Sequence, residues 1–158
     1  MERIKDYSFG IILINRNSGE DKFLLLRSAN TDEWLFPKGH KEGDETSEET
    51  VRRELDEETQ IKTFDFVKSL EYQDNYEYER GGIGYDKTVI FFVGITQEEE
   101  VIIQEKEIGN FKWVNYEDAL RALSFEEPRI ILRKAVEDLI DLNLSKTWIP
   151  DQVGNDKG

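Results

Sequence analysis

Three glutamates and one arginine lie within residues 53–58, which read RELDEE. If this stretch is helical, Glu54, Glu57 and Glu58 fall within about a 100° arc of the helix surface. Carboxylates that close repel one another by roughly 1 kcal/mol per pair in water, and by more where water is partly excluded. Such a cluster of hard oxygen ligands suits Mg²⁺ or Mn²⁺. The alternative is a solvated acidic helix face.

Two stretches of sequence would position these acids. Thr46 and Glu49 form a capping box ahead of two apolar residues four apart, so we predict a helix over residues 47–59. Residues 34–39 (WLFPKG) predict a short buried strand that ends in a Pro/Gly bend, and a polar loop follows. A strand, a loop and a helix that bring carboxylates to one point favour the metal site over the solvated face.

The stretch from Gly39 to Ile61 resembles the Nudix box. In that motif a Gly is followed after five residues by Glu, and after seven more by Arg-Glu, an aliphatic residue, any residue, Glu-Glu, any residue, Gly and an aliphatic residue. The matching residues are Gly39, Glu45, Arg53, Glu54, Leu55, Glu57, Glu58 and Ile61. Gln60 stands where the family has Gly, and a non-Gly residue in the left-handed conformation common after a helix costs roughly 1 kcal/mol. We therefore expect Gln60 to alter the helix exit and to leave the chemistry unchanged.

The resemblance also implies roles for the acids. The implied ligands of Mg²⁺ (or Mn²⁺) are Glu54, Glu57, Glu58 and a backbone carbonyl at Gly39 or Lys38. Glu54 would also be the general base, and Arg53 would orient it by ion pairing; the alternative for Arg53 is an exposed helix charge. Glu107 is a further candidate ligand or base, with a plain loop charge as the equal alternative. Glu45 would brace the loop through hydrogen bonds from backbone N–H groups.

Three segments are similar to the asymmetric dinucleoside tetraphosphate hydrolases within that family. They are residues 34–40 (WLFPKGH), 87–89 (KTV) and 111–113 (FKW). The similarity implies hydrolysis of a nucleoside polyphosphate, above all of diadenosine tetraphosphate to ATP and AMP. A nucleoside triphosphate or RNA 5′-end pyrophosphohydrolase is the alternative, because related enzymes share the Pro-Lys-Gly entry. A nucleotide-binding module without catalysis is the alternative of another class.

Candidate substrate contacts lie outside the box as well as at its entry. Lys38 and Lys87 are candidates for phosphate contacts, although a lone lysine is usually solvated. His40 is a candidate substrate contact, with an exposed loop residue as the alternative. The tyrosines between residues 76 and 85 are candidates for stacking a purine, as aromatic side chains do. We expect one of Tyr76, Tyr78 and Tyr85 to stack and the others to pack within the protein.

The composition limits the partners. There are 35 acidic and 21 basic residues and a net charge of −14, which argues against nonspecific binding to nucleic acid. Nine acids against three bases lie between residues 41 and 60, so an anionic substrate would need metal ions to screen the site. The absence of cysteine, of a signal-like start and of a membrane-length apolar run leads us to expect a cytoplasmic protein without a membrane partner. The sequence leaves the oligomeric state open.

The order of apolar runs predicts an α/β fold. Strands are expected at residues 7–16, 22–28, around 64–67, 87–95 and 111–114, with a polar, tyrosine-rich loop at 75–86. Short and long helices are expected at 115–123 and from about Pro128 to 143. As the resemblance also implies, these elements suit an α/β/α sandwich with a mixed central sheet. We expect a Nudix domain at residues 1–143 and a C-terminal tail at 144–158, in which Trp148 and Ile149 are candidates for docking.

Overall fold

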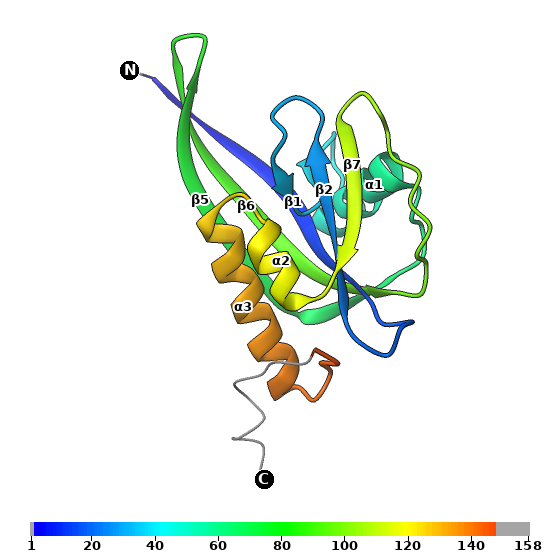
Figure 1. Ribbon diagram of the computed structural model, residues 1–158. Helices are drawn as coiled ribbons and strands as arrows, with labels where there is room; N and C mark the ends of the chain where they lie inside the picture. The colour runs from blue at the N-terminus through cyan, green and yellow to red at the C-terminus, as the bar shows by residue number, and fades with distance from the viewer. Residues whose placement is uncertain (1, 148–158) are drawn as a thin grey trace.

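The computed structural model describes residues 2–147 (Figure 1). Its strands are β1 (Arg3–Asn15), β2 (Lys22–Ser28), β3 (Trp34–Leu35), β4 (Lys38–His40), β5 (Asp65–Arg80), β6 (Ile83–Thr96) and β7 (Ile108–Val114). Its helices are α1 (Ser47–Thr59), α2 (Tyr116–Ala122) and α3 (Glu126–Asp141). None of the helices within residues 2–147 is long and apolar enough to cross a membrane.

All strands belong to one sheet with the order β3-β2-β1-β6-β5, to which β4 adds beside β1 and β7 beside β2. β1 and β6 run parallel along the whole of β1, from the Arg3–Gly84 pair to the Asn15–Thr96 pair. The other pairings are antiparallel. The sheet is therefore mixed, as the sequence predicted.

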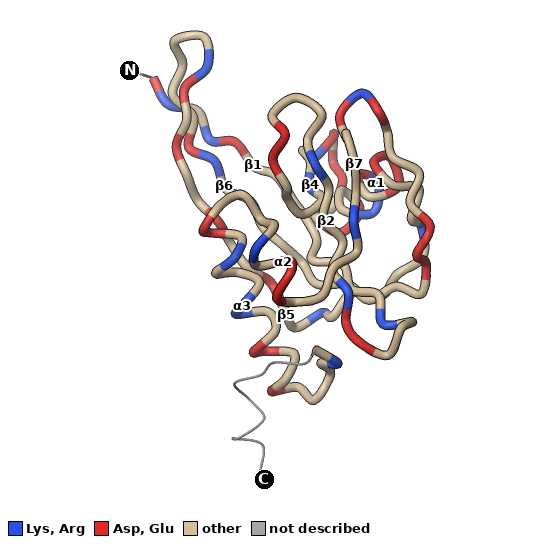
Figure 2. Tube along the Cα trace, viewed as in Figure 1, with Lys and Arg blue, Asp and Glu red and all other residues tan. Residues whose placement is uncertain are grey.

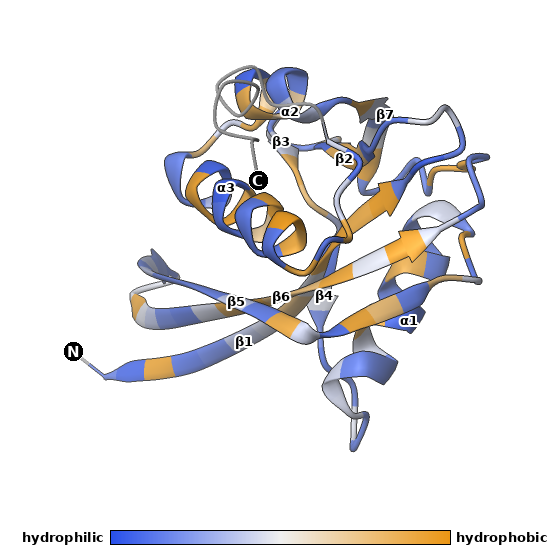
Figure 3. Cartoon of the chain, turned by 90° about the horizontal axis from the view of Figure 1, so that it is seen from below, coloured by the Kyte–Doolittle hydropathy of each residue, from blue (hydrophilic) through white to orange (hydrophobic). Residues whose placement is uncertain are grey.

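Helices cover both faces of this sheet: α1 lies on one face and α2 and α3 lie on the other (Figure 3). The central strand β1 is apolar on both faces. Ile12 and Ile14 pack in the cluster with α3, whereas Ile11 and Leu13 pack in the cluster with α1. A strand covered on both faces reads as a continuous apolar run rather than an alternating one. The expected α/β/α sandwich is confirmed.

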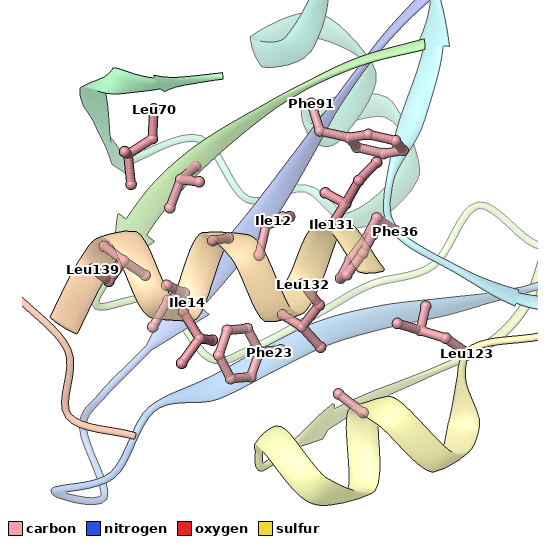
Figure 4. Packing of buried hydrophobic residues seen from close by; sticks show 14 of the residues in the cluster. Ile12, Ile14, Phe23, Phe36, Leu70, Phe91, Leu123, Ile131, Leu132 and Leu139 are labelled. Atoms are coloured by element: carbon pink, nitrogen blue, oxygen red, sulfur yellow. The ribbon is translucent and has the colours of Figure 1, made fainter. Parts of the chain in front are cut away.

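The larger core cluster forms where α3 crosses the sheet. Ile131, Leu132 and Leu139 project from α3 onto Ile12 and Phe23, and all five side chains are buried (Figure 4). Fully burying an aliphatic side chain of this size contributes about 1.5–3 kcal/mol relative to leaving it exposed. This cluster attaches α3 to the sheet.

Helix α1 begins and ends as its sequence predicts. The Thr46 side chain accepts a hydrogen bond from the Glu49 N–H, the Glu49 side chain accepts one from the Thr46 N–H, and both halves of the capping box are present. Val51 and Leu55 are buried in the second core cluster. Gln60 closes the helix at φ 62°, ψ 17°, which is the left-handed conformation that the missing Gly would adopt without strain.

The segment that leads into α1 contains two short strands, whereas one was predicted. Instead of one short strand, β3 pairs with β2 and β4 pairs with β1, and the chain changes partner between them. Pro37 stands at that change. It has no N–H to give to a ladder, but its carbonyl accepts a 3.0 Å hydrogen bond from the Ile11 N–H. Phe36 beside it is buried, whereas β3 itself is half-buried.

The loop predicted at residues 75–86 is wrong: these residues form the ends of β5 and β6. Arg80 pairs with Ile83, so Gly81 and Gly82 alone make the turn. Their φ values of 60° and 78° are the positive values that two-residue hairpin turns require. The outer parts of β1, β5 and β6 (residues 3–7, 75–80 and 83–88), here called the arm, extend away from the helices (Figure 1).

The first residues of the expected tail pack on the domain. Asp21, in the turn between β1 and β2, is fully buried and forms a 3.0 Å ion pair with Arg16. Its carboxylate also accepts hydrogen bonds from the Lys146 N–H at 2.9 Å and the Thr147 hydroxyl at 3.0 Å. The chain after α3 is thus tied to the β1–β2 turn as far as it is described. Trp148 and Ile149, the predicted docking residues, lie outside the described residues.

Candidate functional site

A cavity of about 750 Å³ opens between the arm and β4, the strand that leads into α1. Acidic side chains line one end of it and the tyrosines of the arm line the other. The residues that sequence analysis singled out and that line it are Lys38, Gly39, His40, Glu54, Glu58, Tyr76, Tyr78, Tyr85, Lys87 and Glu107. Among the predicted catalytic, metal-binding and substrate-binding residues, Arg53 and Glu57 do not line it, and neither does the predicted loop brace Glu45. Most of the candidate site is therefore brought together in one place.

The contact between β4 and α1 fixes the position of Glu54. Gly39 approaches its carboxyl group so closely that a Cβ on Gly39 would lie 2.0 Å from the Glu54 Cδ. Only glycine can occupy this position without moving the carboxylate. The expected ion pair with Arg53 is present, at 2.9 Å from Nη1 to the Glu54 Oε1.

Arg53 joins the helix to the loop before it. Its Nε donates to the Glu45 carboxylate at 2.6 Å, and its Nη2 donates to the His40 carbonyl at 2.7 Å. Glu45 also accepts a hydrogen bond from the Glu42 backbone N–H at 2.9 Å, as expected for a loop brace. The hydrogen bonds from Arg53, followed by that from Glu42, lower the pKa of Glu45 to about 2. The Glu45–Arg53 pair stays charged and rigid at neutral pH.

Glu58 is a buried acid whose side chain is not fully hydrogen-bonded. Its side chain is only 6% exposed, and its Oε1 is the one buried side-chain oxygen or nitrogen without a hydrogen-bond partner in the described part of the chain. Burial, followed by the charges of Glu54, Glu107 and Glu57, raises the pKa of Glu58 well above its usual value. Burial also raises the pKa of Glu54, and Arg53 opposes that change. A buried carboxylate without a partner is costly, so a cation at this point would be stabilising.

These residues fit a divalent cation in kind, although they do not close around one by themselves. Within residues 2–147 no three His, Asp or Glu side chains stand close enough to hold a metal ion unaided. One cause is visible: Arg53 draws Glu54 and Glu57 toward itself, with N–O distances of 2.9 and 3.3 Å. The unpartnered Glu58 oxygen, with Glu54 and Glu107 lining the same cavity, is the observation that favours a hard cation.

Lys38 lies between the acidic end and the tyrosines. It is half-buried, and its ammonium stands 5.9 Å from the centre of the Tyr76 ring. Burial, followed by the charge of Lys87, lowers the pKa of Lys38, while nearby carboxylates oppose the change. A second cavity of about 280 Å³, lined by both apolar and polar side chains, shares Lys38, Glu58 and Glu107 with the first. Glu58 and Glu107 thus line both cavities.

Lys87, the predicted phosphate contact, is buried with only 6% of its side chain exposed. Its ammonium lies 3.0 Å from the Asp6 Oδ2, 2.6 Å from the Ser8 hydroxyl and 3.0 Å from the His40 Nε2. His40 is mostly exposed and also contacts the Asp6 Oδ1 at 3.0 Å. The pairing of β1 with β6 places Asp6 beside Lys87, and the pairing of β1 with β4 places Ser8 beside His40.

The tyrosines form a connected surface on the arm. Tyr78 and Tyr85 stack on each other, with ring centres 4.8 Å apart and planes 9° apart. The Tyr78 hydroxyl donates to Asp6 at 2.7 Å, and this bond, with burial second, raises the pKa of Tyr78 to about 12. Tyr76 is 42% exposed and lies 6.3 Å from Tyr78. Because Tyr85 already has a ring against it, Tyr76 offers the freer surface for a base.

Two residues at the centre of this end, Asp6 and Ser8, were missed from the sequence. Both lie in the first half of β1, where a polar residue belongs to no recognisable sequence motif. The cue available was the alternation in β1, which places Asp6 and Ser8 on one face. That cue becomes useful only when the partner strands are known.

Comparisons with known proteins agree with this geometry. The NUDIX domain family model matches residues 5–135. The asymmetrical bis(5′-nucleosyl)-tetraphosphatase of Caenorhabditis elegans is 26% identical over 126 residues, covering 79% of this chain and 90% of that protein. Its counterpart in Rattus norvegicus is 28% identical over 117 residues, covering 72% and 77%. A crystal structure of a C. elegans Ap4A hydrolase binary complex superposes with a TM-score of 0.76 at 25% identity, covering 86% of this chain and 98% of that one.

The family model covers most of the chain, including β1, the entry to α1, the acidic helix and the strands of the arm. The relatives match over most of their own length. The chain belongs to the Nudix family and is a pyrophosphohydrolase of that family.

Proposed function

We propose that this enzyme hydrolyses nucleoside polyphosphates with the help of Mg²⁺ or Mn²⁺, and that its substrate is diadenosine tetraphosphate, cut to ATP and AMP. The observation that carries the proposal is the buried, unpartnered Glu58 oxygen at one end of a cavity whose other end is lined by lysine and tyrosine. One end suits a cation with phosphate on it, and the other suits a nucleoside. The relatives named as tetraphosphatases support the choice of substrate.

The proposed metal ligands are Glu54, Glu57, Glu58, the backbone carbonyl of Gly39 and Glu107. When bound, the ion would screen the phosphate charge and help to generate hydroxide from water. Glu58 contributes a buried oxygen that has no hydrogen-bond partner within the described residues. Glu57 is half exposed and adds charge at the rim.

Glu54 is the proposed general base, and Arg53 is its positioning residue. The carboxylate faces the cavity, is held from behind by Gly39 and is kept in place by the Arg53 guanidinium. Burial raises the pKa of Glu54, which makes it a better proton acceptor, and the Arg53 guanidinium opposes that rise. Glu107, which lines the same cavity, is the next candidate. Positioning and electrostatics, without a covalent intermediate, would supply most of the rate.

An asymmetric cut requires that one nucleoside lies away from the reacting phosphorus. Tyr76, with Tyr85 and its partner Tyr78, would hold that base on the arm, and Lys38 would meet the phosphates between the base and the acidic cluster. The second cavity, on the other side of Glu58, leaves space for the opposite end of a dinucleotide. This space favours a dinucleotide over a triphosphate.

The test is product analysis after incubation with diadenosine tetraphosphate, ADP-ribose, nucleoside triphosphates and RNA with a 5′-triphosphate. We expect ATP and AMP in equal amounts, poor use of ADP-ribose, and complete loss of turnover in excess chelator that added Mg²⁺ or Mn²⁺ restores. ADP as sole product, or a preference for ADP-ribose or RNA, would overturn the substrate. Binding of nucleotides without any cleavage would instead show a binding module, and full turnover in chelator would remove the metal.

A further inference from the structure

Asp6 is a negatively charged side chain that lines the cavity in which we propose that the negatively charged polyphosphate binds. Its Oδ2 accepts hydrogen bonds from Lys87 at 3.0 Å and from the Tyr78 hydroxyl at 2.7 Å, and its Oδ1 lies 3.0 Å from the His40 Nε2. An ammonium and a hydroxyl that both donate to a carboxylate are also the kinds of donor that bind a phosphate group in proteins. The carboxylate is 16% exposed and lines the large cavity.

The donors of Lys87 leave no room for an additional acceptor. An ammonium group carries three N–H bonds, and those of Lys87 are directed at the Asp6 carboxylate, the Ser8 hydroxyl and the His40 Nε2, which accepts in the tautomer that carries its proton on Nδ1. In that tautomer His40 does not donate to Asp6. A phosphate can bond to Lys87 only by replacing one of these partners. Asp6 is the one that carries a full negative charge, so it repels the arriving phosphate as well as occupying its donor.

We propose that Asp6 is a built-in competitor that a substrate phosphate displaces from Lys87, so that it sets the affinity of the cavity for polyphosphate. This inference rests on the proposed function of the same site. A long, highly charged polyphosphate has further contacts with which to displace Asp6. A monophosphate has fewer, so Asp6 returns to Lys87 and favours release of AMP.

The sharpest test is Asp6→Asn. Asparagine keeps the size of the side chain and an oxygen that accepts from Lys87 and Tyr78, but it removes the charge that competes with phosphate. We expect the KM for diadenosine tetraphosphate to fall about five-fold, kcat to change less than two-fold, and inhibition by AMP to strengthen. A role of Asp6 in holding the fold or the tyrosines would raise KM or lower kcat. An unchanged or higher KM would therefore overturn the proposal.

A second measurement does not depend on hydrolysis of any nucleotide. Inorganic tripolyphosphate with Mg²⁺ is titrated into the wild-type protein and into Asp6→Asn by calorimetry. We expect about five-fold tighter binding by the variant. Equal binding, weaker binding, or no binding by either protein would contradict the competition. Failure to cleave diadenosine tetraphosphate, with tighter tripolyphosphate binding retained, would overturn the proposed substrate and leave the role of Asp6 intact.

Two further variants control for charge and for the partner. Asp86→Asn removes the same charge one residue from Lys87, but Asp86 pairs with Arg3 at 2.8 Å and alternation places it on the opposite face of the arm. It should leave tripolyphosphate binding unchanged. Asp6→Asn combined with Lys87→Met removes both charges of the pair and so avoids leaving one of them unpaired. This double variant should bind tripolyphosphate no more tightly than the wild type; a five-fold gain would show that Asp6 does not act through Lys87.

Discussion

The two ends of the large cavity treat charge in opposite ways. At the α1 end, Glu54 and Glu57 both pair with Arg53, and the buried Glu58 oxygen has no hydrogen-bond partner among the described residues. At the arm end, the ammonium of the buried Lys87 already has acceptors around it, and one of these acceptors is the Asp6 carboxylate. Figure 2 shows acidic and basic residues side by side along this arm.

The difference teaches what each end gains from a ligand. The acidic end is stabilised by any cation that enters, because its own charges repel. The arm end is already satisfied, so a ligand there must exchange partners with the protein. An end with unbalanced charge provides affinity for metal, and an end with balanced charge provides discrimination between ligands.

The largest expected effect is at the acidic end. Glu54→Gln keeps the shape of the side chain but removes its charge and its ability to accept a proton, so we expect kcat to fall by about 10²-fold or more. Steady-state kinetics with diadenosine tetraphosphate measure the change. Glu48→Gln, an exposed position in the first turn of the same helix, is the matched control and should stay within two-fold. Equal kcat values for folded Glu54→Gln and wild type would move the base to Glu107.

The next effect is at the arm end and should appear in binding instead. Tyr76→Ala removes the exposed ring beside Lys38, and base stacking contributes about 1–3 kcal/mol. We expect KM to rise about ten-fold with kcat nearly constant, because stacking acts equally in the ground and transition states. Tyr7→Ala is the control: Tyr7 is 48% exposed on β1 but does not line the cavity. A loss confined to kcat would show that Tyr76 serves the chemistry.

The sequence predicts the acidic end better than the arm end, because most residues of the acidic end lie close together in the chain. Three of the four acids at the acidic end, Glu54, Glu57 and Glu58, lie on one helix, and the capping box, the α1 bounds and the Arg53–Glu54 pair were all correct in advance. The arm end joins residues 81 positions apart, since Asp6 meets Lys87 only through the parallel β1–β6 pairing. No local pattern specifies that pairing.

The arm itself had a local signal of a different kind. Its tyrosines alternate with charged residues with a period of two, and Gly81-Gly82 is a two-residue hairpin turn. The prediction of a loop was wrong because neither face of the arm is apolar enough to look like a strand buried in a core. The lining of the cavity, not the core, accounts for the pattern.

A pH experiment separates the unbalanced end from the balanced one. The pKa of Glu58 is raised above its usual 4.5, so the folded protein binds this proton more tightly than the unfolded chain. The contribution of Glu58 to stability is full below pH 4.5 and is lost as the pH rises through its raised pKa. In metal-free protein at pH 8 we therefore expect Glu58→Gln to melt about 3 °C higher than wild type, with little difference at pH 4.

Calorimetric melting curves at several pH values, with chelator and with Mg²⁺, measure this effect. Mg²⁺ should raise the melting temperature of the wild type more than that of Glu58→Gln. Glu48→Gln again serves as the control and should follow the wild type. Parallel curves for Glu58→Gln and wild type at every pH would mean that Glu58 carries no unbalanced charge.

The smallest expected effect tests whether the one departure from the Nudix box touches the acidic end at all. Gln60 has φ 62°, and its N–H donates to the Asp56 carbonyl at 2.8 Å, so the left-handed conformation is held by the helix end. Gln60→Gly relieves the contact between Cβ and the carbonyl oxygen, which costs about 1–2 kcal/mol, but adds freedom to the unfolded chain, which offsets about 0.5–1 kcal/mol. The net gain should be about 0.5–1 kcal/mol, or roughly 2 °C in melting temperature for a chain of this length.

Asn143→Gly is the matched control for Gln60→Gly, because Asn143 has φ 61° just after α3. Asparagine tolerates the left-handed region better than glutamine, since its short side chain hydrogen-bonds locally. Its replacement should therefore give less than half the gain of Gln60→Gly in urea denaturation. Neither variant should alter kcat or KM, because Gln60 lies beyond Glu58 and outside the cavity. A change in kcat for Gln60→Gly would show that the helix exit positions the acids, and that the acidic end depends on more than the residues facing it.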